Sequence, residues 1–179
     1  MKVLIDACVL YPTVLRRIVL GAAGAGAFTP LWSARILEEW ARAADRNGVE
    51  ARPEVALLRA DWPDAEVAVR HTTQTRLSLP DPDDLHVLAA AIDGGADEVL
   101  TLNLKDFPTQ ALSAEGLIRR HPDEFLLEVF HDGAVDLLAI VRDIHADAQR
   151  MAGVDLALRA VLKKSRLPRL GKALDDGAG

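Results

Sequence analysis

The sequence predicts an α/β fold, a three-layer α/β/α sandwich around a mostly parallel central sheet, with further helices at the C-terminal end. Three observations support this prediction. Residues 2–5 (KVLI) form a short apolar run that ends abruptly at Asp6, which is typical of a buried parallel strand. Residues 81–102 combine a helical repeat of apolar positions with a following apolar run, which is half of a βαβ crossover. After Pro108 the pattern becomes mostly helical.

Extended and helical segments alternate through the first half of the chain. Pro12 suits the first turn of a helix, and the glycines between positions 21 and 26 end it. A second short strand is expected at 28–31. Ser33 is an N-cap candidate for the next helix, which stops at Gly48. The residues expected to face inward from the first helix are Val14, Leu15, Ile18 and Val19.

The middle of the chain continues the alternation. A helix is expected at 53–61 and a strand at 66–69. Asp81-Pro82 opens another helix, Gly94-Gly95 ends it, and a strand follows at 98–102. The apolar positions that repeat at helical spacing in this helix are Leu85, Leu88, Ala89 and Ile92.

The C-terminal region reads as an added layer of helices. These are expected at 122–131, 134–150 and 154–164, with a frayed tail from Leu170 onward. We therefore divide the chain into a domain over 1–130 and a helical extension over 131–179 that packs on the same domain. At 179 residues the chain is long enough for one full hydrophobic core.

Composition and charge limit the classes of function. No apolar stretch approaches the roughly 20 residues of a membrane span. The N-terminus carries an Asp within its apolar run, which does not fit a signal peptide. The single cysteine, Cys8, fits a reducing cytoplasm and a small buried hydrophobe. The net charge of −6 argues against charge-driven nucleic-acid binding, except at the acid-free segment 159–172 with its six basic residues.

Acidic side chains gather at one predicted edge of the sheet. Asp6 follows the first strand, and Asn103 and Asp106 follow the strand near Thr101, so all reach the carboxyl edge where α/β proteins bind ligands. Asp84 lies in the first turn of the helix that leads towards that strand. Glu39 lies one turn into the helix that begins near Ser33. Taken singly, Asp84 could serve its helix dipole and Glu39 could be a solvated surface acid.

Taken together, these carboxylates indicate a divalent cation. Acids within a few ångströms raise one another's pKa unless a cation holds them. Mg²⁺ or Mn²⁺ is the natural choice, because both take oxygen ligands and keep water molecules. No Cys/His set is available for zinc. Such a centre suits phosphodiester hydrolysis.

Four motifs in this order resemble the PIN-domain nucleases. They are the apolar strand ending at Asp6, S-x-x-I-L-x-E ending at Glu39, D-P-D-D-L-H-V-L-A-A-A around Asp84, and L-T-L-N-L-K-D-F around Asp106. The resemblance covers roughly residues 1–130 and is closest to the bacterial branch of VapC-type toxins. It implies a compact α/β/α fold and a metal-dependent endoribonuclease that acts on single-stranded RNA. It also implies a homodimer and a small antitoxin that binds across the acidic groove, with an Arg or Lys among the carboxylates.

The resemblance also implies roles for individual residues. Asp6, Glu39, Asp84 and Asp106 match the acidic metal-binding set of the family. Asn103 matches a position that is Asp or Asn in such proteins, and Thr101 matches a small hydroxyl residue beside the site. Asp81 and Asp83 crowd Asp84, and which of the three faces the metal stays open. The position of Leu88 and Ala91 relative to the family's buried apolar positions favours Asp84.

Two other classes of function were weighed against a nuclease. A phosphohydrolase that uses Asp6 as its nucleophile would want a second Asp two residues on, where this sequence has Cys8. A non-catalytic binding module of the same fold would have a degenerate acidic set, but no member of the set is missing. His86 is expected on the helix surface, facing away from the metal side of Asp84.

Overall fold

The computed structural model describes residues 1–176, and their elements form two compact units. The first unit consists of Met1–Tyr11 and Thr29–Arg120 and holds the whole sheet. The second consists of Pro12–Phe28 and the chain from His121 onward, and it is helical. The division into a 1–130 domain and a 131–179 extension stays a prediction. Within the described residues, no helix is both long and apolar enough to cross a membrane.

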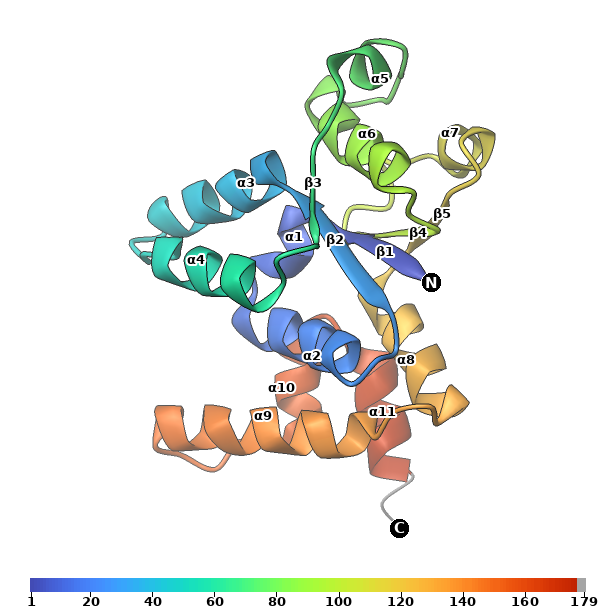
Figure 1. The fold of residues 1–179 in the computed structure, drawn as a ribbon. Helices are drawn as coiled ribbons and strands as arrows, with labels where there is room; N and C mark the ends of the chain where they lie inside the picture. The colour runs from blue at the N-terminus through green and yellow to red at the C-terminus, as the bar shows by residue number, and fades with distance from the viewer. Residues whose placement is uncertain (177–179) are drawn as a thin grey trace. The chain divides into compact units, whose positions relative to one another are not determined.

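One parallel sheet organises the first unit, as Figure 1 shows. In the described residues its strand order is β3-β2-β1-β4-β5, and each neighbouring pair is parallel. Leu4 is paired with Leu31 on one side and with Val99 on the other, so a row of buried side chains crosses the centre of the sheet. The strands are β1 (Lys2–Ile5), β2 (Thr29–Ser33), β3 (Glu66–Val67), β4 (Glu98–Leu100) and β5 (Ile118–Arg120).

The order of the strands explains where the helices of the first unit lie. The chain moves outward from β1 to β2 to β3, and then crosses back to β4 and β5. Because parallel crossovers are right-handed, the two directions of travel place their helices on opposite faces. Figure 1 shows α3 and α4 on one side of the strands and α5, α6 and α7 on the other. The helices of this unit are α1 (Ala7–Leu10), α3 (Ala34–Asp45), α4 (Arg52–Asp61), α5 (His71–Thr75), the 3₁₀ turn η1 (Pro82–Asp84), α6 (Leu85–Gly94) and α7 (Thr109–Ala114).

The predicted α/β sandwich with a parallel sheet is therefore confirmed. The strand expected at 28–31 lies at Thr29–Ser33, and the strands expected at 66–69 and 98–102 are shorter than predicted. The short elements α1, α5, α7 and β5 were not predicted, since segments of three to six residues carry too few periodic positions.

Two adjacent glycines fix α6 against the sheet. A Cβ at Gly94 would lie 2.8 Å from Val67 Cγ2 and 3.0 Å from Leu31 Cδ1, so only a glycine allows this close approach. Gly95 ends the helix with a left-handed φ of 62°. The predicted end of the helix at Gly94-Gly95 is thus confirmed. The close packing of Gly94 on the sheet also fixes the position of α6, and therefore of Asp84 at its start.

The second unit is built from α2 (Thr13–Gly24), α8 (Pro122–Asp132), α9 (Leu137–Ala152), α10 (Leu158–Lys164) and α11 (Pro168–Asp176). The predicted helices match α2 and α8 to α10. Of the side chains expected inward on α2, Leu15, Ile18 and Val19 are buried and Val14 is half-buried.

The predicted frayed tail is wrong for residues 170–176, and its last three residues, 177–179, lie outside the described residues. Leu170 and Leu174 of α11 are buried. The carboxylate of Asp123 accepts the backbone N–H groups of Arg169 and Leu170 at 3.0 to 3.1 Å, so it caps the helix from another segment. Such a long-range cap cannot be read from the local sequence.

Candidate metal centre

Asp6 and Thr101 bring the ends of two adjacent strands together. The Asp6 N–H donates to the Leu100 carbonyl at 3.0 Å, and the buried Thr101 hydroxyl donates to Asp6 Oδ2 at 2.7 Å. β1 and β4 are neighbours whose onward connections leave in opposite directions, so their carboxyl ends form the crevice in which such folds bind ligands. The structure therefore places Asp6 and Thr101 at the predicted edge.

The sequence predicted that Cys8 is a small buried hydrophobe. In the structure Cys8 belongs to this polar arrangement instead. Its thiol donates to Asp6 Oδ2 at 3.0 Å and accepts the Leu102 N–H at 3.2 Å. Burial, followed by the charge of Asp6, raises the pKa of the Cys8 thiol well above its usual range. The thiol therefore stays protonated and acts as a hydrogen-bond donor to the carboxylate, without nucleophilic character.

Asp106 is held by the loop that follows β4. Its carboxylate accepts a hydrogen bond from the Asn103 side-chain amide, and the buried Phe107 anchors the loop in the core. Arg119, from β5, donates to the carbonyls of Leu104 and Phe107, the latter at 3.0 Å. The loop is thus tied down on both sides of Asp106.

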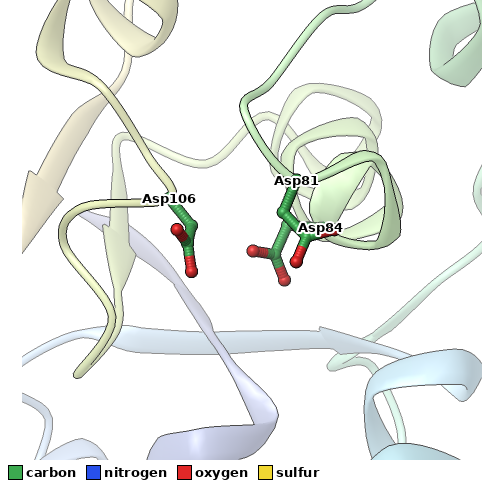
Figure 2. Close-up of side chains that lie close together, drawn as sticks. All are labelled: Asp81, Asp84 and Asp106. Atoms are coloured by element: carbon green, nitrogen blue, oxygen red, sulfur yellow. The ribbon is translucent and has the colours of Figure 1, made fainter.

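Three carboxylates converge on one space. Asp81, Asp84 and Asp106 each offer an oxygen, and these oxygens all lie within 4.8 Å of one another. Figure 2 shows Asp106 on one side and Asp81 and Asp84 on the other, with their carboxylates facing the gap between them. Among the described residues this is the group of acidic side chains that is spaced for a metal ion.

The electrostatics of Asp84 reflect this crowding. Burial raises the pKa of Asp84 to about 6, and the negative charges of Asp6, Asp81 and Asp106 contribute to the increase. His86 acts weakly in the opposite direction. Asp6 lies outside the group of three, yet it is near enough for its charge to act on Asp84. Like charges held this close are destabilising unless a cation is shared between them.

The donor set fits Mg²⁺ or Mn²⁺. Both ions take carboxylate oxygens at about 2.1 Å, so two ligands of one ion lie about 3 to 4 Å apart, a separation that oxygens within 4.8 Å of one another allow. One oxygen of Asp81 accepts the Asp83 N–H at 2.9 Å, which orients its carboxyl group. Asp83 itself is exposed and outside the group.

Glu39 is not in the group of three, because other partners engage it. His86 Nε2 lies 2.8 Å from Glu39 Oε1, and Arg35 Nε donates to the same oxygen at 3.3 Å. Burial raises the pKa of Glu39, but the hydrogen bonds and charges of His86 and Arg35 outweigh burial and lower it overall. Arg35 also donates to the Asp83 carbonyl at 3.3 Å, so it links Glu39 to the segment that carries the acids.

The expectation that His86 lies on the helix surface is wrong. Its side chain is 3% exposed, since α6 is buried on all sides from His86 to Ala91. The contact between His86 and Glu39 joins residues of α6 and α3, so sequence spacing alone carried no signal for it. The spacing of Arg35 and Glu39 did carry a signal for their contact, because residues four apart share a helix face.

Comparisons with known proteins agree with this geometry. The family model described as PIN domain matches residues 2–105. The protein named "Putative ribonuclease VapC50" of Mycobacterium tuberculosis (strain ATCC 25618 / H37Rv) is 49% identical over 45 residues, which are 25% of this chain and 27% of that protein. The match thus spans about a quarter of the relative's length. No solved structure matches.

Proposed function

Because the chain belongs to the PIN-domain family, we propose that it is a nuclease, and more specifically a Mg²⁺- or Mn²⁺-dependent endoribonuclease that cleaves single-stranded RNA. The observation that carries this proposal is the convergence of Asp81, Asp84 and Asp106, with the pKa of Asp84 raised to about 6. A cation held there would neutralise charge on the phosphate and lower the pKa of a bound water.

Some residues of the chain would bind the cation, and others would position those ligands. Asp84 and Asp106, with Asp81 or Asp6, would hold the cation, and Glu39 stays a predicted metal ligand. Thr101 keeps the Asp6 carboxylate in place through its 2.7 Å hydrogen bond, and Asn103 orients Asp106. These contacts hold the acids before substrate arrives, so little reorganisation is needed during the reaction.

Basic residues on α10 and α11 support contact with RNA. All six cations of the predicted segment are exposed, in a chain whose net charge is −6. Arg166, at the turn between the two helices, has φ of 64°; every other positive-φ residue in the described chain is a glycine. A bulky cation therefore occupies a position that favours glycine. The six residues are Arg159, Lys163, Lys164, Arg166, Arg169 and Lys172.

We further propose that the protein is the toxin of a type II toxin–antitoxin pair, in the cytoplasm and as a homodimer. The name of the mycobacterial relative and the family resemblance support the toxin assignment. An antitoxin would place an Arg or Lys among Asp81, Asp84 and Asp106, since a cationic side chain relieves the same repulsion as a metal ion. Co-purification with the product of the neighbouring gene tests this association.

Substitution of Asp6 tests the catalytic proposal. Asp6→Asn should reduce Mg²⁺-dependent cleavage of a single-stranded RNA at least about 100-fold, because the charge that acts on the centre is lost. Asp64→Asn, at an exposed acid in the loop before β3, is the control and should cut normally. Circular dichroism checks that both variants fold. Equal cleavage by parent and Asp6→Asn would contradict the assignment of the site.

A further inference from the structure

A cavity of about 600 Å³ opens at the carboxyl ends of β2 and β3. The side chains of Val67 and Val69 contribute apolar surface to its wall. Arg35, Gln74 and His86 contribute hydrogen-bonding groups. Cavities of this size that combine apolar surface with hydrogen-bonding groups are typical of small-molecule and nucleotide sites.

The cavity lies beside the acidic group on the same edge of the sheet. All five strands are parallel, so the ends of β2 and β3 face the same way as the end of β1. Neighbouring strands are about 5 Å apart, which places these ends about 5 and about 10 Å from the end of β1. Arg35 and His86 both line the cavity and contact Glu39, and Arg35 also reaches the Asp83 carbonyl. The two sites are therefore contiguous.

The lining fits a nucleobase better than a phosphate. A phosphate requires several converging cations, whereas this lining has two histidines and one guanidinium, that of Arg35, which already donates to Glu39, and it also includes the carboxylate of Glu66. A base has apolar faces and a hydrogen-bonding edge, and proteins bind unstacked RNA bases by stacking on planar groups, arginine included, and by hydrogen bonds to that edge. The half-buried Gln74 offers both a donor and an acceptor, which an edge of a base needs.

We propose that this cavity binds one base of the single-stranded RNA, from the nucleotide next to the scissile phosphate, and that Gln74 contacts the edge of that base. The proposal rests on the proposed ribonuclease function and adds a base subsite to it. The acidic group repels phosphate in the absence of a cation. A pocket beside it that binds an uncharged base would supply binding energy that does not depend on the metal.

Abasic substrates test the subsite. A set of RNAs of one sequence, each lacking the base at one position around the cut, is cleaved by the parent, and kcat/KM is measured. We expect a loss of about 10- to 100-fold at one position adjacent to the cut, because stacking and edge contacts are lost there. Gln74→Ala should cut the intact RNA more slowly and lose most of its sensitivity at that same position.

Two further variants make the result decisive. Ala68→Trp adds bulk at an exposed position of the lining and should raise KM for the intact RNA, with less effect on the abasic one. Thr72→Ala, on the same helix as Gln74 but outside the lining, is the matched control and should behave as the parent.

The outcomes separate the two proposals. Cleavage that is equally efficient with a base removed at any position, or equal sensitivity in Gln74→Ala and Thr72→Ala, overturns the subsite and leaves the nuclease standing. If the parent cuts none of the RNAs in Mg²⁺ or Mn²⁺, the ribonuclease proposal itself fails and the subsite fails with it.

Discussion

Replacing Asp84 with Asn should stabilise the metal-free protein near neutral pH. The carboxyl group has a pKa of about 6 in the folded chain, against an ordinary value of 3.8. This difference corresponds to about 3 kcal/mol, and solvent screening of a partly exposed group reduces it to about 1 to 2 kcal/mol. Asn keeps the shape of the side chain but carries no charge, so the repulsion and the cost of burying the charge are both removed.

The pH dependence follows from the direction of the pKa change. A raised pKa means that the folded state favours the protonated carboxyl group of Asp84. The stability that comes from this preference is fully present below about pH 4. It is lost as the pH rises through about 6. The gain from Asp84→Asn should therefore be largest at pH 7 and should disappear near pH 4. Urea unfolding at several pH values, with the metal removed by EDTA, measures it.

Mg²⁺ should reverse the order of stability. At 100 times its Kd, a metal ion adds about 2.7 kcal/mol to the parent, which exceeds the gain from the substitution, while the variant should gain much less because a charged ligand is gone. Asp83→Asn, at an exposed neighbour outside the group of three, is the control and should change stability by no more than about 0.5 kcal/mol. A less stable Asp84→Asn at pH 7 without metal would refute the reasoning.

Three further substitutions test the supports of the site and of the second unit. Thr101→Val removes the hydrogen bond to the Asp6 carboxylate and should cost about 1.5 to 3 kcal/mol in thermal unfolding; an unchanged melting temperature would contradict this. Arg119→Met should speed amide hydrogen exchange in the loop around Asp106 and weaken Mg²⁺ binding about 10-fold, both measurable without RNA. Asp123→Ala should cost about 1 to 2 kcal/mol and raise exchange in α11 above that in α9, whereas uniform exchange would argue against the cap.

Predictions from the sequence were most reliable where a pattern is periodic and the geometry of parallel sheets adds a rule. An apolar run that stops at Asp6 predicted β1, and the shared edge of parallel strands predicted that Asp6 lies at the same edge as Asn103 and Asp106, which follow the strand near Thr101. In the structure the Thr101 hydroxyl donates to Asp6 Oδ2 at this edge. The prediction for His86 failed because burial of α6 depends on α3 and on the sheet, and neither is visible within the helix itself.

The sequence by itself determined the α/β class, the parallel edge and the acidic residues that reach it, because these follow from hydrophobic periodicity and the direction of the strands. Only the tertiary structure decided that Asp81 joins Asp84 and Asp106, and that Glu39 pairs with His86. The distances between carboxylates depend on turns and side-chain rotamers that packing selects, and adjacent acids of one turn differ by several ångströms in where their oxygens lie.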